Sequence, residues 1–102
     1  MEHKQISLPK LNNLTPTLES TTLKLLEEAG ELAQAIGKFR GMNGEQIKLN
    51  HDKVMTMITK ELLDVAQTAV TMMYVLEEQY GVNLQAALNE HVEKLKAKNY
   101  LV

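Results

Sequence analysis

The chain contains 102 residues, of which 44% are hydrophobic and 24% charged, and its 11 basic and 13 acidic side chains give a formal charge of −2. This composition is typical of one small globular domain, here spanning residues 1–102. Without cysteine, the chain has no disulfide scaffold, thiol nucleophile or cysteine-based zinc site. The acidic excess argues against binding of a nucleic acid polymer, and no apolar run approaches the roughly 20 residues that span a membrane. We therefore expect a cytoplasmic protein that binds neither.

Residues 1–15 precede the first predicted helix and carry no long periodic pattern, so we expect an N-terminal arm or a short turn of helix. Thr15 followed by Pro16 is a typical helix start, because a threonine hydroxyl caps the helix and proline leaves no N–H unpaired at the first position. Apolar residues then recur at helical spacing to about Arg40. We expect one sector of this helix to face the core: Leu18, Thr22, Leu25, Leu26, Ala29, Leu32, Ala33 and Ile36.

A second, longer helix is predicted over residues 53–80. Gly41 and Gly44 mark a polar connection before it, and Asn50 or Asp52 can cap its first turn. The apolar stripe of this helix is broad, and further apolar side chains lie outside it, so we expect apolar neighbours on more than one side. The stripe comprises Val54, Ile58, Leu62, Val65, Ala66, Ala69, Met72, Met73 and Leu76.

A third helix is predicted over residues 83–98, where leucine, alanine and valine recur at helical spacing. The predicted fold class is therefore all-α, an antiparallel bundle of three main helices with a short N-terminal arm. A domain of this length buries a modest core, and the second helix is apolar on more than one side. We expect oligomerisation, as a homodimer or a homotetramer, to complete the bundle.

Acidic side chains gather at two places in the predicted helices. Glu27, Glu28 and Glu31 form a strip on the first helix, and Glu61 and Asp64 lie one turn apart on the second. The strip lies opposite the apolar sector of its own helix, which favours an ordinary solvated face. Glu61, in contrast, borders the apolar stripe of its helix, where a carboxylate needs a partner.

A lysine, a proton or a cation shared with the first helix could serve as that partner. If the two helices pack antiparallel, Glu28 and Glu31 face Glu61 and Asp64, and four carboxylates around one point would require a cation. Oxygen ligands without histidine or cysteine favour Mg²⁺, with Mn²⁺ as a substitute. Such an ion suits a phosphate-bearing substrate, so the acids indicate phosphoryl chemistry.

The segments Leu26–Leu32 and Glu61–Val65 resemble the EExxE and ExxD signatures of the MazG-like proteins in the all-α NTP pyrophosphatase superfamily. The resemblance covers about residues 18–100. It implies an enzyme that cleaves a nucleoside triphosphate between the α and β phosphates, releasing a monophosphate and pyrophosphate. Attack by a metal-activated water would require no covalent nucleophile.

The same resemblance implies a role for each acid. Mg²⁺ would be held by four carboxylates: Glu28, Glu31, Glu61 and Asp64. Glu27 would bind a further metal ion or orient the attacking water, and the implied catalytic residues are Glu27, Glu28 and Glu61. Substrate phosphates would meet basic and aromatic residues: Lys38, Arg40, Lys94, Lys98 and Tyr100. For each of the basic residues, an ordinary surface charge is the alternative.

Two departures from the family pattern concern the segments around the acids. The spacer over residues 32–60 is long and indicates an extended loop, and a short arm replaces the N-terminal helix of many relatives. Because the acids contact phosphates rather than the base, phosphoribosyl-ATP pyrophosphatase and dUTP or dCTP pyrophosphatase remain alternatives. A non-catalytic helical dimerisation module, or a regulatory module that binds nucleotide without cleaving it, is the alternative of another class.

Overall fold

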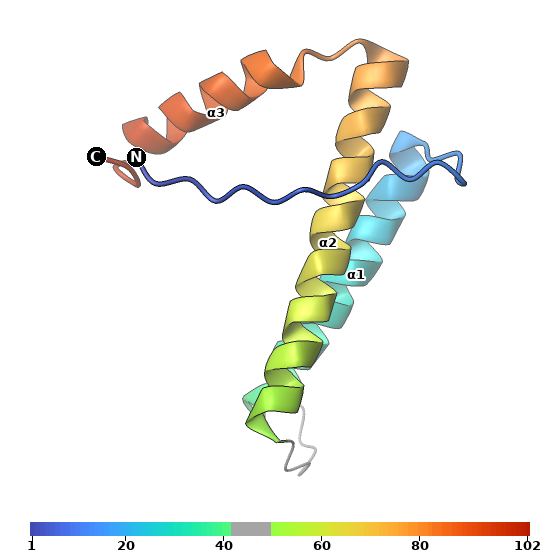
Figure 1. Ribbon diagram of the computed structural model, residues 1–102, viewed down its shortest axis with the longest axis vertical. Helices are drawn as coiled ribbons and strands as arrows, with labels where there is room; N and C mark the ends of the chain where they lie inside the picture. Colours follow the sequence, from blue (N-terminus) through green and yellow to red (C-terminus); the bar gives the residue numbers. More distant parts are fainter. Residues whose placement is uncertain (42–49) are drawn as a thin grey trace.

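The computed structural model describes residues 1–41 and 50–102. Within them the chain is all-α, with α1 (Leu18–Phe39), α2 (His51–Tyr80) and α3 (Leu84–Ala97) and no strand. Helices α1 and α2 pack side by side and antiparallel, whereas α3 extends away from the end of α2 (Figure 1). The predicted all-α class is confirmed. Gly44 and most of the predicted extended loop lie outside the described residues.

Helix α1 begins two residues later than its sequence signal predicts. Thr17 is the N-cap: its hydroxyl accepts a hydrogen bond from the Ser20 N–H at 3.0 Å, and the Ser20 hydroxyl accepts one from the Thr17 N–H at 2.9 Å. The prediction of Thr15 as cap is wrong because a helix capped there would have Leu18 at the third position, where leucine cannot return the hydrogen bond. Thr17 with Ser20 satisfies two backbone donors.

The other helix ends follow their local signals closely. The Asn50 side chain accepts a hydrogen bond from the Asp52 N–H at 2.8 Å, and α2 ends at Gly81, whose φ of 65° is left-handed. The Asn83 side chain likewise caps α3, which ends with Lys98 as its C-cap. Among these described helices, none has the length and apolarity needed to cross a membrane.

On each of the two long helices, residues spaced seven apart line the contact between α1 and α2. We call this set of residues the α1–α2 seam; it consists of Thr21, Glu28 and Ala35 on α1 and Val54, Glu61, Thr68 and Val75 on α2. Such spacing keeps one face of each helix on its neighbour. All seam residues are buried except Glu61, which is half-buried. A glutamate therefore interrupts the middle of the seam on both helices.

The apolar sector of α1 that was predicted to face the protein core lies largely outside this seam. Within this sector Leu26 is 67% exposed and Ile36 is 41% exposed, while Leu62 in the apolar stripe of α2 is 52% exposed. The expectation that the whole of this α1 sector faces the core is therefore wrong. The alternative of an ordinary solvated face for the carboxylate strip does not fit Glu28, which is buried. The small side chains of Thr21 and Ala35 let the two helices approach on either side of Glu28.

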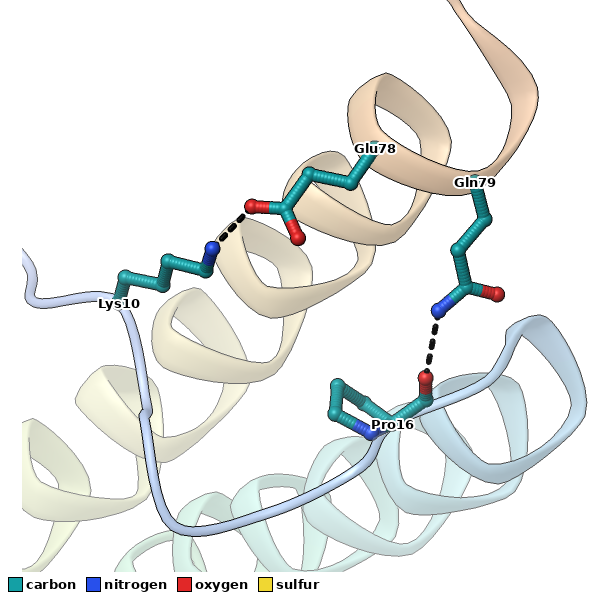
Figure 2. A network of polar contacts seen from close by, with 4 residues as sticks. All are labelled: Lys10, Pro16, Glu78 and Gln79. Carbon is teal, nitrogen blue, oxygen red and sulfur yellow. Dashed lines mark hydrogen bonds and ion pairs between the residues drawn. The ribbon is translucent and has the colours of Figure 1, made fainter.

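The N-terminal arm is irregular and includes Pro16, which the sequence signal had placed in the first helix. The arm crosses the α1–α2 pair before α1 begins (Figure 1). Two glutamine side chains of α2 hold it. Gln67 donates from Nε2 to the Pro9 carbonyl at 2.9 Å. Gln79 donates from Nε2 to the Pro16 carbonyl at 3.0 Å, as Figure 2 shows. The arm is therefore fastened to α2 at two points.

A charged contact lies between these two fastenings. The Lys10 ammonium group pairs with the Glu78 carboxylate, as Figure 2 shows. The same ammonium group lies 5.4 Å from the centre of the Tyr74 ring, within the range of a cation–π contact. Both partners belong to α2, so the middle of the arm also follows this helix.

Candidate active site

Three carboxylates converge in the middle of the α1–α2 seam. Glu28, Glu31 and Glu61 each offer one oxygen such that the three atoms lie within 4.8 Å of one another. Glu28 and Glu31 are neighbours on one face of α1 because they are three residues apart, and the antiparallel packing brings Glu61 of α2 against them. We call these three residues the acid cluster.

Two carboxylates of the acid cluster are wholly or partly buried, and their negative charge is not fully compensated by neighbouring groups. The Glu28 side chain is only 8% exposed, and Glu61 is half-buried. Within the described part of the chain, Glu28 Oε2 and Glu61 Oε2 are buried and have no hydrogen-bond partner. Burying a charged oxygen without a partner is costly, so the donor set fits a bound cation. All of these ligand atoms are carboxylate oxygens, which suit a hard divalent ion.

Like charges also act on the exposed member of the cluster. The negative charge of Glu28 raises the pKa of Glu31 above its ordinary value, with smaller contributions from partial desolvation and from Glu61. The shift means that the third negative charge is resisted by the first two. A cation between the carboxylates would remove this resistance.

Lys24 is a site residue that the sequence analysis did not identify. Its ammonium Nζ lies 3.0 Å from Glu28 Oε1 and 3.6 Å from Glu27 Oε1. The hydrogen bond to Glu28, followed by the charge of Glu27, raises the pKa of Lys24. Its position four residues before Glu28 was the available signal, since such pairs meet on a helix surface. Lys24 supplies part of the positive charge that the acids require.

Glu27 and Asp64 lie beside the acid cluster rather than within it. The Glu27 side chain is 58% exposed and is paired with Lys24. Asp64 is exposed, one turn after Glu61 on α2, and lines a pocket together with Glu28. The structure thus brings together three of the four carboxylates predicted as metal ligands. The fourth, Asp64, lies in the wall of the adjacent pocket.

The predicted phosphate-binding residues are spread over the molecule. Lys38 is half-buried two turns after Glu31 on α1, and the Arg40 guanidinium lies over the Phe39 ring, 4.8 Å from its centre. Three others belong to the C-terminal part, where α3 points away from the α1–α2 pair (Figure 1): Lys94, Lys98 and Tyr100. Within a single chain, α3 does not bring these three side chains to the acid cluster.

Comparison with known proteins supports the reading of the motif. A family model described as the MazG nucleotide pyrophosphohydrolase domain matches residues 16–100. The match includes both acidic helices and most of the chain, so the protein belongs to the MazG nucleotide pyrophosphohydrolase family. The resemblance inferred from the two acidic motifs is confirmed. Comparisons with curated proteins and with solved structures gave no match.

Proposed function

We propose that this protein is a Mg²⁺-dependent pyrophosphohydrolase that converts a nucleoside or deoxynucleoside triphosphate into the monophosphate and pyrophosphate. The observation that carries the proposal is a pair of buried oxygens, of Glu28 and Glu61 beside Glu31, that have no partner among residues 1–41 and 50–102. Family membership supplies the class of reaction, and the chemistry of the ligands supplies the cation. Mn²⁺ is the expected substitute. We further propose a single domain over residues 1–102 and a cytoplasmic location.

Each acid then has a distinct task. Glu28, Glu31 and Glu61, joined by Asp64 from the pocket wall, would hold the cation. When bound, Mg²⁺ would neutralise phosphate charge and activate a water for attack on the α-phosphorus. Glu27 is exposed at the edge of the cluster, where its carboxylate can accept the proton of the attacking water or bind a further ion.

Basic residues would hold the phosphates that the cation leaves uncovered. Lys24 is exposed at its side chain and lines the pocket next to Glu28, so its ammonium group can move from the acid to a phosphate. Lys38 and Arg40 lie further along α1 and are the next candidates. The C-terminal residues would contribute from a neighbouring copy: Lys94, Lys98 and Tyr100.

A homodimer or homotetramer is part of the proposal. Among residues 1–41 and 50–102, the buried apolar residues are Ala35, Val54 and Val75, which make a very small core. The exposed side chains of Leu26 and Leu62 belong to apolar faces that a second copy can cover. A chain of this length gains much of its stability from such burial.

The test is pyrophosphate release from a panel of nucleotides that includes ATP, dUTP, dCTP and phosphoribosyl-ATP. We expect release with Mg²⁺ or Mn²⁺, none with EDTA, and at least about a hundredfold loss in Glu61→Gln, because the variant keeps the shape of the side chain and removes a ligand charge. Glu90→Gln, which neutralises an exposed carboxylate on α3, is the matched control.

The ranking within the panel distinguishes the substrate classes. A strong preference for phosphoribosyl-ATP, or for dUTP or dCTP, would select the corresponding alternative enzyme. Folded protein that releases no pyrophosphate from any of these nucleotides would contradict the proposal. Nucleotide affinity without product would then favour a regulatory binding module, and the absence of affinity would favour a dimerisation module.

A further inference from the structure

A pocket opens beside the acid cluster, between the N-terminal arm and the two long helices. Its volume is about 470 Å³, within the range of small-molecule sites. Glu28 and Asp64 form part of its wall. The arm supplies another part, with the side chains of Leu11, Leu14 and Pro16. We call this space the arm pocket.

The walls of the arm pocket differ in chemistry. Among its lining residues, Lys24 is the basic one, and it is already paired with Glu28. The arm contributes mainly apolar side chains, together with Thr15. Helix α2 contributes Gln67 and Thr71, whose hydroxyl donates to the Gln67 carbonyl at 2.9 Å. A ligand that fits both walls has a phosphate end, joined to the acids by the cation of the proposed function, and an uncharged end, placed against the arm.

The position of the arm is set by specific contacts rather than by apolar contact alone. The fastened carbonyls belong to Pro9 and Pro16, so the pocket-lining leucines lie between two hydrogen-bonded points. Gln67 has two functions here, because it holds Pro9 and also lines the pocket. The apolar wall is therefore held in place next to the acids before any ligand binds, which limits the ordering that binding must supply.

We propose that the arm pocket is the nucleoside subsite, and that Leu11 and Leu14 are specificity-determining residues of the arm. This inference rests on the proposed function. The phosphates lie toward Glu28 and Asp64, and the base and sugar lie between the arm leucines and α2. Contact with the base comes from aliphatic side chains on the arm, and Gln67 and Thr71 line the same space.

The first test compares substrates with and without a nucleoside. Methyl triphosphate keeps the reacting phosphates and lacks the base and sugar. In Leu11→Ala and Leu14→Ala we expect kcat/KM for the preferred nucleoside triphosphate to fall about tenfold further than kcat/KM for methyl triphosphate. Ile6→Ala is the matched control, because Ile6 is an exposed apolar arm residue that is absent from the pocket wall. Equal losses on the two substrates would overturn the inference.

The second test does not depend on turnover. The affinity of an α,β-methylene nucleoside triphosphate, measured by titration calorimetry with Mg²⁺, should weaken about tenfold in Leu11→Ala and Leu14→Ala and stay unchanged in Ile6→Ala. Unchanged affinity in both leucine variants would overturn the subsite. Wild-type protein that binds the analogue but cleaves no nucleotide would instead contradict the proposed function alone. Circular dichroism at the same concentration verifies that each variant is folded.

Discussion

Glu28 places a negative charge in a helix contact whose other α1 members are threonine and alanine. Lys24 reaches one of its oxygens, whereas the other oxygen is buried without a partner in the described chain. The uncompensated negative charge of Glu28 is explained if a divalent ion binds there, because the ion supplies the positive charge that Lys24 alone does not.

The raised pKa of Glu31 leads to a prediction about pH. The folded metal-free protein holds the Glu31 proton more tightly than the unfolded chain, so this group costs no stability below its ordinary pKa of 4.5. The cost appears as pH rises through the raised pKa of the folded state and is then fully present. In EDTA, Glu31→Gln should therefore raise Tm at pH 7 and have little effect at pH 4.

Scanning calorimetry of wild-type protein and Glu31→Gln at both pH values checks this prediction. Saturating Mg²⁺ should abolish the advantage of the variant at pH 7, since the ion removes the repulsion among the wild-type carboxylates. A Tm difference that is the same at pH 4 and pH 7 would contradict the assigned cause. Glu90→Gln again serves as the exposed control on α3.

The sequence predicted the proximity of the three carboxylates better than their surroundings. The spacing of Glu28, Glu31 and Glu61 is sufficient to bring them together once two helices pack antiparallel, and the motif adds the chemistry. Lys24 could not be predicted as a site residue, because a lysine four residues before a glutamate is a common pattern on helix surfaces. Its importance depends on the burial of Glu28, which only the packed helices define.

At the scale of elements, the start of α1 gives a test of its cap. Thr17→Ala removes the hydroxyl that accepts from the Ser20 N–H, and we expect it to lower the free energy of unfolding by about 1 kcal/mol. For a domain of this size, that corresponds to a fall in Tm of roughly 4–8 °C. Thermal unfolding at a fixed protein concentration measures it.

Thr15→Ala is the matched control for the cap. Its hydroxyl lies in the arm, before the helix begins, so its loss should change Tm by much less than the loss at Thr17. An equal or larger effect of Thr15→Ala would place the helix start where the Thr-Pro signal put it. The comparison therefore tests the structural assignment of the cap directly.

Most helix ends were predictable because their signals are local, although the Thr15-Pro16 signal placed the start of α1 two residues too early. The packing faces were not predictable. Asn50, Gly81 and Asn83 act through backbone groups within a few residues, and these signals are present in the sequence. The face that α1 turns to α2 depends on which surfaces α2, the arm and other copies offer. Amphipathicity identified the leucine sector as apolar, but it could not distinguish contact with α2 from contact with a second chain.

At the scale of the whole molecule, the exposed leucine sector predicts self-association. We expect Leu26→Glu to shift the sedimentation coefficient of the native oligomer toward that of a single chain. The substitution places a charge on the exposed apolar surface that a second copy is proposed to cover. Analytical ultracentrifugation over a range of concentrations measures the shift. Gln34→Glu adds the same charge at an exposed polar position of α1 and should leave the oligomer intact.

A wild-type protein that sediments as one chain at all concentrations would contradict the proposed oligomer. It would also leave Lys94, Lys98 and Tyr100 without a route to the acid cluster, since α3 extends away from the α1–α2 pair in its own chain (Figure 1). The state of association thus decides whether the C-terminal part belongs to the site.

The fastening of the arm by two glutamine amides has a consequence for its response to ionic strength. Neutral hydrogen bonds are hardly weakened by dissolved salt, whereas an exposed pair such as Lys10 with Glu78 is screened. Concentrated electrolyte should therefore loosen the middle of the arm while Pro9 and Pro16 stay attached. The arm would bow outward between two fixed ends rather than peel away, so a saline medium would widen the space beside the acids without removing its wall.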